Sequence, residues 1–158
     1  MRITSYVMEL NEDRISALVK ESSRNYPEIN RLDSPKKIVD MFNLAFNAKC
    51  KAEEYIWLLA LDKKCHLIGI FEISHGTVDS SIVTPREVFI RLCLCGATMF
   101  VLVHNHPSGE TTPSQDDIKT TQRMKDSGKI MGIELIDHII IGETYYSFNE
   151  AGIISAGQ

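Results

Sequence analysis

The sequence lacks the features that mark several large classes of protein. None of its apolar runs approaches the length of a membrane span, and its N-terminus has no apolar segment like that of a signal peptide. We therefore expect no membrane insertion and a cytoplasmic location. Lysine and arginine form no block longer than a pair, and the formal net charge is -4. A broad surface for phosphate groups is not expected from this balance, so DNA binding should be weak or absent.

Cysteine occurs, but not in an informative arrangement. The chain has four cysteines, and none of them forms the Cys-x-x-Cys spacing of a redox or zinc motif. Thiols of cytoplasmic proteins are usually reduced. We therefore expect four free cysteines that serve as packing residues, namely Cys50, Cys65, Cys93 and Cys95.

The remaining composition is that of an ordinary globular domain. The chain has 158 residues, of which 44% are hydrophobic and 24% charged, enough for one domain with a substantial core. From residue 34 onward the apolar patterns predict a helix, a hairpin, a helix, a strand, a helix and a second hairpin. This order implies an α/β fold in which helices flank a mixed β-sheet. The strands are expected over residues 54–62, 65–74, 99–103, 133–141 and 144–148.

Residues 1–33 are the least informative part of the sequence. Residues 3–10 could form a strand, and residues 12–23 carry apolar residues at a spacing typical of a helix. We treat residues 1–33 as an N-terminal extension of uncertain role. Residues 34–158 then form the main domain.

Each of the three expected helices begins with a recognisable signal. A serine or threonine precedes a proline, which suits the cap and the first helical position. These pairs are Ser34–Pro35, Thr84–Pro85 and Thr112–Pro113. Glu87 and Gln115 occupy the capping-box positions of the second and third helices. We expect these two helices to end near Gly96 and Gly128.

Two histidines and a carboxylate are brought together by the pattern around residues 101–117. His104 and His106 follow the expected strand 99–103, and residues i and i+2 of an extended chain point to the same side. Ser114 and Asp117 are three residues apart, so they share a face of the helix that follows. A single histidine at a strand end is usually an ordinary polar residue. Here three protein ligands with one open position indicate a catalytic zinc site rather than a closed structural one.

The same residues carry a resemblance to a known family. The order His-x-His, seven residues, Ser, two residues, Asp resembles the JAMM metal motif of the JAB/MPN metalloprotease superfamily, with His104, His106, Ser114 and Asp117 at its positions. The surrounding sequence is similar to that of the RadC-like branch of that superfamily. The segments concerned are 79–89, 104–109 and 135–142, within a resemblance that covers roughly residues 34–150. Thr84 stands where a histidine is common in that branch.

The resemblance implies a cytidine-deaminase-like architecture and one zinc ion per chain, held by His104, His106 and Asp117. It implies hydrolysis of a peptide or isopeptide bond in a peptide or protein substrate by a metal-activated water. The motif also requires a glutamate at the start of a neighbouring strand. Glu54 matches that position as the general base, and the adjacent Glu53 is the second candidate. Ser114 would donate a hydrogen bond to the water or to the tetrahedral oxyanion.

Two alternatives to a hydrolase stay open. Relatives in the RadC-like branch often carry an N-terminal helix-hairpin-helix module that binds the DNA backbone, and residues 1–33 are too short for it. The RadC-like branch is associated with DNA repair and recombination, so an accessory of those processes is the alternative function, although neither a basic face nor a DNA-binding module is evident. A catalytically silent interaction domain is a weaker third reading, because silent relatives have lost residues of the motif.

Two pairs of polar residues near the motif have no assigned role. We expect that Asp137 or His138 supports the site from behind its ligands or pairs within the sheet. Ser80 and Ser81 either line a substrate groove or satisfy backbone groups in their own loop. The sequence predicts no oligomeric state.

Overall fold

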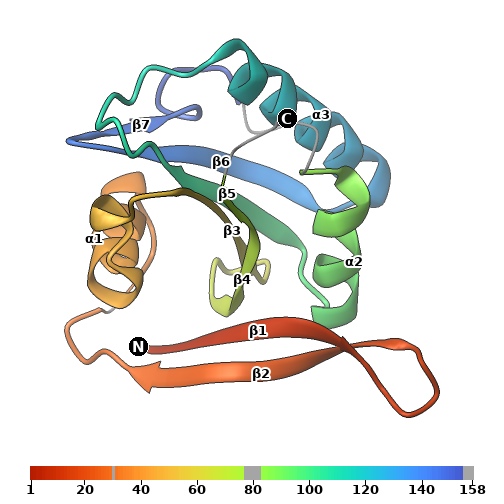
Figure 1. Cartoon of the computed structure of the whole chain (residues 1–158). Helices are drawn as coiled ribbons and strands as arrows, with labels where there is room; N and C mark the ends of the chain where they lie inside the picture. The colour runs from red at the N-terminus through yellow and green to blue at the C-terminus, as the bar shows by residue number, and fades with distance from the viewer. Residues whose placement is uncertain (30, 77–82, 155–158) are drawn as a thin grey trace.

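The computed structural model describes residues 1–29, 31–76 and 83–154, which form one seven-stranded sheet with helices on both faces (Figure 1). The strands are β1 (Arg2–Leu10), β2 (Ser16–Asn25), β3 (Glu54–Leu61), β4 (Leu67–Gly76), β5 (Met99–Asn105), β6 (Glu134–Ile141) and β7 (Tyr145–Ser147). The helices are α1 (Pro35–Phe46), α2 (Pro85–Cys95) and α3 (Gln115–Met131), with a short 3-10 helix η1 (Ala48–Cys50).

The sheet is mixed, and the predicted α/β fold is confirmed. The strand order is β2-β1-β4-β3-β5-β6-β7. β1 is parallel to β4 and β5 is parallel to β6, whereas the other neighbouring pairs are antiparallel. The chain passes from β5 to β6 through α3, because parallel neighbours need a crossover connection.

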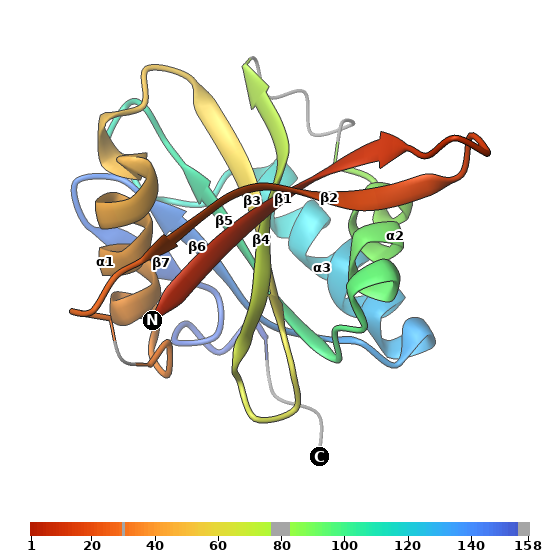
Figure 2. The same ribbon diagram turned by 90° about the horizontal axis from the view of Figure 1, so that it is seen from below.

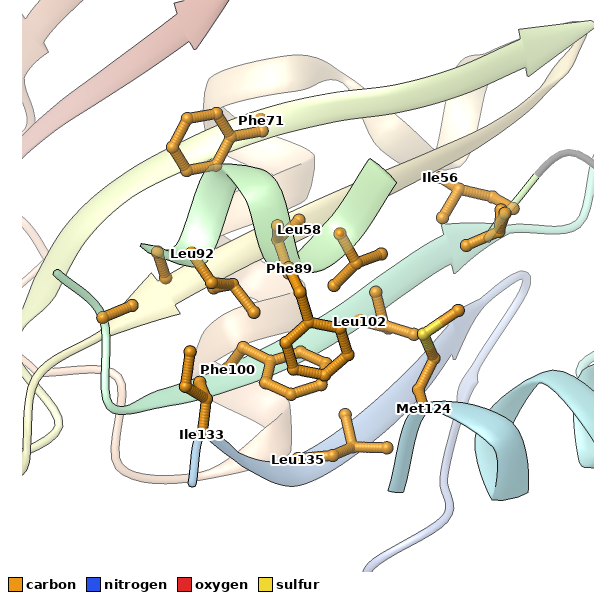
Figure 3. Close-up of a cluster of buried hydrophobic side chains, with 14 of the residues drawn as sticks. Ile56, Leu58, Phe71, Phe89, Leu92, Phe100, Leu102, Met124, Ile133 and Leu135 are labelled. Carbon is orange, nitrogen blue, oxygen red and sulfur yellow. The ribbon is translucent and has the colours of Figure 1, made fainter. Parts of the chain in front are cut away.

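The central strand β3 is buried on both sides. Leu58 and the residues that alternate with it point to the face covered by α2 and α3, whereas Leu59 and its alternating neighbours point to the face covered by α1. Figure 3 shows the first cluster, in which Phe89 and Leu92 of α2 and Met124 of α3 pack against the sheet. Burial of each large apolar side chain stabilises the fold by roughly 1.5–3 kcal/mol. Burial on both sides explains why β3 is an uninterrupted apolar run in the sequence.

The N-terminal segment contains one confirmed strand and one wrong prediction. β1 matches the strand expected over 3–10, but residues 12–23 form no helix, because most of them belong to β2, which pairs with β1. The chain reverses after Asn11, whose side-chain oxygen accepts a hydrogen bond from the Ile15 N–H. Leu18 then packs against the cluster beneath α2, and Figure 2 shows the hairpin crossing the sheet toward that helix. Strand pairing and packing thus override the local helical spacing.

The predicted starts of α1 and α2 are confirmed. The side chains of Ser34 and Thr84 accept hydrogen bonds from the backbone N–H groups three residues later, and a proline follows each cap. Gly96 ends α2 in the left-handed conformation, with φ of +69°. Glycine adopts this conformation without the steric cost that other residues meet.

The predicted start of α3 is wrong by two residues. Its cap is Ser114 rather than Thr112, and Asp117 rather than Gln115 occupies the capping-box position. The serine hydroxyl accepts from the Asp117 N–H while the carboxylate accepts from the Ser114 N–H. This reciprocal pair satisfies two backbone donors at once, so it outcompetes the cap two residues earlier.

The predicted end of α3 is also wrong, because the helix continues through Gly128 and is capped by Gly132. Gly128 is buried, and a Cβ atom at this position would lie 2.5 Å from the backbone oxygen of Ile133. The residue is therefore a glycine because the chain packs closely against the helix, not because the helix ends there.

The four cysteines are free, as expected, but the prediction that all of them pack in the interior is wrong. Cys50, Cys65 and Cys93 are exposed, and Cys95 is partly buried. The three exposed residues lie in η1, in the β3–β4 turn and on α2.

Two further expectations concern the loop that contains Ser80 and Ser81 and the absence of a membrane-spanning segment. Ser80 and Ser81 lie outside the described residues, so both readings of them stay predictions. Among the helices that the structure describes, none combines the length and the apolar character needed to cross a membrane.

Candidate metal centre

Four polar side chains from three elements meet at one end of the sheet. His104 is the penultimate residue of β5, His106 follows that strand, Glu54 begins β3 and Asp117 lies in the first turn of α3. In the β3–β5 pair, Ile56 is opposite His104. Alternation along both strands therefore turns Glu54 and His106 to the same face as His104, the face that α3 covers.

The side-chain atoms of this cluster are closely spaced. The Nε2 atoms of His104 and His106 are 3.0 Å apart. Nε2 of His104 lies 3.3 Å from Oδ1 of Asp117 and 3.9 Å from Oε1 of Glu54, and Nε2 of His106 lies 3.7 Å from Oδ2 of Asp117. The His104 side chain is 2% exposed, whereas Glu54 is 23% exposed. The cluster is thus enclosed on the side of the sheet and reached by solvent beside Glu54.

The donor atoms fit a zinc ion. Nδ1 of His106 lies 2.6 Å from the backbone oxygen of Glu110. A carbonyl oxygen only accepts, so Nδ1 carries the ring hydrogen and the Nε2 of a neutral His106 presents a lone pair to the cluster. Zinc is commonly bound by imidazole nitrogen and carboxylate oxygen at about 2.0–2.2 Å. Two nitrogens on one ion at such distances can lie as close as the two Nε2 atoms do, so His104, His106 and Asp117 could hold zinc with Glu54 beside it.

The two carboxyl groups of the cluster have opposite pKa shifts. Burial raises the pKa of Glu54 and outweighs the lowering effect of His104 and His106. Burial alone would raise the pKa of Asp117 as well, but its interactions with the two histidines and with Ser114 hold that pKa far below its usual range. The lowered pKa keeps Asp117 ionised at neutral pH, so its carboxylate suits the binding of a cation. Glu54 is the weaker acid and is better suited to exchange a proton.

Ser114 fixes the orientation of Asp117. Its hydroxyl donates a hydrogen bond to Oδ2 of Asp117 at 2.7 Å and accepts one from the Asp117 N–H at 3.1 Å. These contacts hold Oδ2 at the helix start, while Oδ1 lies near His104. Because the single hydroxyl hydrogen is used on Asp117, donation from Ser114 to a water or an oxyanion stays a prediction.

The structure brings Glu54, and not Glu53, into the cluster. Glu53 is exposed, and its backbone oxygen accepts a hydrogen bond from Nδ2 of Asn105 at 3.0 Å. Oδ1 of Asn105 accepts a hydrogen bond from the Tyr55 N–H at 2.8 Å. Asn105 therefore holds the backbone on both sides of Glu54. Sequence reasoning missed this residue. Its place between the two histidines was the available signal, because alternation along β5 turns the residue between them to the opposite face of the sheet.

Of the two polar residues in β6, His138 contacts the cluster and Asp137 does not. Nε2 of His138 lies 2.9 Å from Nδ1 of His104, and burial holds the pKa of His138 well below its usual value. Asp137 instead accepts hydrogen bonds from the Ser147 hydroxyl and from the backbone N–H groups of His138 and Asn149. The contacts of Asp137 join the end of β7 to β6, so Asp137 supports the sheet. His138 instead lies behind His104, on the side away from the cluster.

The fold and the cluster define a class of protein, the α/β domains of JAB/MPN type with a histidine and carboxylate group at one end of the sheet. Comparison with known families narrows this class. Residues 32–153 match the RadC-like JAB domain, and the chain belongs to that family. The family resemblance seen in the motif is thereby confirmed.

Related proteins extend beyond the region shared with this chain. The chain is 43% identical over 132 residues to a UPF0758 protein of Pelobacter propionicus, and 38% identical over 133 residues to a UPF0758 protein of Geotalea uraniireducens. It is 52% identical over 102 residues to a UPF0758 protein of Syntrophomonas wolfei. These alignments cover 83%, 84% and 64% of this chain, but only 57%, 58% and 43% of the relatives. The chain thus spans about half the length of the curated relatives it matches.

Proposed function

We propose that this chain is a zinc-dependent hydrolase of JAMM type that cleaves an amide bond in a peptide or protein substrate. One observation carries the proposal. Glu54, His104, His106 and Asp117 each bring one ligand atom within 4.8 Å of the others, in a member of the RadC-like JAB domain family. This set offers three metal ligands and a neighbouring base, which is the composition that hydrolytic metal sites need.

His104, His106 and Asp117 would hold one zinc ion per chain. When bound, zinc supplies a Lewis acid that lowers the pKa of a water from about 16 toward about 7. Asp117 brings the negative charge of the ligand set, and Ser114 keeps it in place. We propose that the Ser114 hydroxyl turns its hydrogen from Asp117 to the attacking water or to the oxyanion during turnover, while the Ser114 N–H keeps its hydrogen bond to Asp117.

Glu54 would act as the general base. Its carboxylate is at the solvent-reached side of the cluster, 3.9 Å from Nε2 of His104, and Asn105 fixes its backbone. Because burial raises its pKa, Glu54 takes up a proton more readily than an ordinary surface glutamate and can return that proton to the leaving amine. General acid–base catalysis of this kind typically contributes about 10²–10⁴-fold to the rate.

The metal part of the proposal is tested by elemental analysis of protein purified without an affinity tag. We expect close to one zinc per chain, and loss of that zinc in the His104→Ala, His106→Ala double variant. Wild-type zinc content in the double variant would rule out this ligand set.

The hydrolytic part is tested with Glu54→Gln, after a peptide library has provided a cleavable substrate. Glutamine keeps the shape of the side chain but cannot accept the proton, so we expect unchanged zinc content and a loss of rate of about 10²–10⁴-fold. Glu53→Gln is the matched control, because the exposed Glu53 carboxylate lies outside the cluster. Loss of turnover in the control alone would show that the base was assigned to the wrong residue.

A further inference from the structure

A chain of buried hydrogen bonds runs from α3 through β6 to the back of His104. The Thr121 hydroxyl donates to the backbone oxygen of Asp117 at 2.7 Å and lies 2.6 Å from Nδ1 of His138. Nε2 of His138 in turn lies 2.9 Å from Nδ1 of His104. As whole residues, Thr121, His138 and His104 are each at most 3% exposed, so bulk solvent does not compete for these contacts.

We infer that Thr121 and His138 form a relay that sets the tautomer of His104, so that its Nε2 atom is the bare nitrogen facing the cluster. Thr121 and His138 are thus positioning residues for the metal centre. The inference deepens the proposed function and rests on it only where it concerns zinc. The tautomer itself is a property of the protein without metal.

The direction of the relay follows from the number of hydrogens. The backbone oxygen of Asp117 only accepts, so it takes the single hydroxyl hydrogen of Thr121. The hydroxyl must then accept from Nδ1 of His138, which places the ring hydrogen of a neutral His138 on Nδ1. Nε2 of His138 is left as an acceptor, and the hydrogen of His104 must lie on Nδ1 to fill it. Among the assignments in which both rings are neutral, only this one places one hydrogen in each of the three contacts.

The two candidate histidine ligands reach the same tautomer by different means. His106 donates its Nδ1 hydrogen to the backbone oxygen of Glu110, whereas His104 needs a side chain from another strand. The ring of His138 is held for this contact by Phe148, whose ring stacks on it with centroids 4.9 Å apart and planes at 12°. The stack fixes the plane of the ring, and the contacts with Thr121 and His104 decide which nitrogen faces each partner.

The relay should strengthen metal binding. If the hydrogen of His104 were on Nε2, it would point at Asp117 and His106, and the nitrogen could not bind a cation until the tautomer changed. A residue that holds the correct tautomer and orients the ligand ring typically contributes about 10–100-fold to metal affinity. We expect a loss within that range when the relay is broken at Thr121 or at His138.

The tautomer is measured by long-range proton–nitrogen NMR on metal-free protein with nitrogen-15 labelled histidine, which distinguishes a protonated ring nitrogen from a bare one. In the wild type we expect His104 and His138 to carry their hydrogens on Nδ1. Thr121→Val keeps the shape of the side chain but removes the hydroxyl, so the tautomers should become mixed. Thr121→Ser restores the hydroxyl and should restore the wild-type spectrum. Thr120→Val is the matched control, since it makes the same change at the adjacent buried position of α3.

Zinc affinity is measured on the same variants by competition with a chromophoric chelator. We expect Thr121→Val to weaken zinc binding by about 10-fold or more, and Thr121→Ser and Thr120→Val to bind as the wild type does. His138→Phe keeps the ring stacked on Phe148 and should weaken binding up to about 100-fold. If the His138→Phe variant does not fold, the Thr121→Val variant alone tests the effect on zinc affinity.

Two results would overturn the inference. One is a wild-type His104 with its hydrogen on Nε2. The other is a Thr121→Val variant with both the wild-type tautomers and the wild-type zinc affinity. The NMR measurement uses neither zinc nor substrate, so it judges the relay separately from the proposed function. A wild-type protein that binds no zinc would overturn the proposed function instead.

Discussion

Asn105 offers a sharp test of how the fold positions the general base. Its side chain is 1% exposed and makes two hydrogen bonds to the backbone, one with the Glu53 oxygen and one with the Tyr55 N–H. The residue between these two is Glu54. Substitution Asn105→Ala removes both bonds without touching any of the four cluster side chains.

The expected loss of stability can be worked out from the surroundings of the two groups. A backbone group left without a partner costs about 1–3 kcal/mol when it stays buried. The Tyr55 N–H is in a partly buried region and should cost most of that range, whereas the exposed Glu53 can recover some hydration. The total is about 2–4 kcal/mol. With a slope of about 2 kcal/mol per molar urea, the unfolding midpoint should fall by about 1–2 M.

The effect on function should be separate from the effect on metal binding. Freed from Asn105, the backbone around Glu54 can shift, and a misplacement of about 1 Å can cost on the order of 10²-fold in rate. We expect kcat to fall by up to that amount under conditions where the variant is fully folded, with zinc content unchanged. Asn105→Asp should be at least as unstable as Asn105→Ala at neutral pH, because it keeps the acceptor for the Tyr55 N–H but buries a carboxylate against the Glu53 oxygen.

The assays are urea unfolding of chelator-treated protein, zinc analysis and peptide cleavage. Asn43→Ala is the control, since the Asn43 side chain makes a single hydrogen bond to the Lys49 N–H in an exposed position. It should lower the midpoint far less. An Asn105→Ala variant with the wild-type midpoint would refute the role of Asn105 in holding the backbone around Glu54. A variant that loses zinc together with activity would show that Asn105 also supports the metal ligands.

Three further predictions concern the metal ligand, the packing of α3 and the surface charge. Asp117→Asn should raise the zinc dissociation constant, because it removes the anionic ligand while keeping the side-chain shape; an unchanged constant would exclude Asp117 as a ligand. Gly128→Ala should lower the free energy of unfolding by about 1–3 kcal/mol, because its Cβ atom would lie 2.5 Å from the Ile133 oxygen. The gain in helix propensity of about 1 kcal/mol does not offset that clash. Thermal unfolding measures the change, and Ser127→Ala is the control. Duplex DNA should bind no more tightly than the micromolar range at physiological salt, given the net charge of -4, and a submicromolar dissociation constant would revive the DNA repair alternative.

The sequence alone determined the α/β class, two of the three helix starts and the set of candidate site residues. These conclusions depend on patterns between near neighbours in the chain. The i, i+2 spacing of His104 and His106 and the three-residue spacing of Ser114 and Asp117 keep their meaning in any strand or helix that contains them. The same holds for a serine or threonine that precedes a proline at a helix start.

The tertiary structure decided what depends on residues far apart in the chain. The register of β3 against β5 placed Glu54, and not Glu53, beside the histidines. Pairing of β2 with β1 replaced the helix that the spacing of residues 12–23 had suggested. The contacts of Asn105 with β3, and of His138 with α3 and β5, likewise arise from strand and helix packing. A short stretch of sequence carries no information on such pairs, because strand order and register are set by the burial of the whole sheet rather than by any one segment.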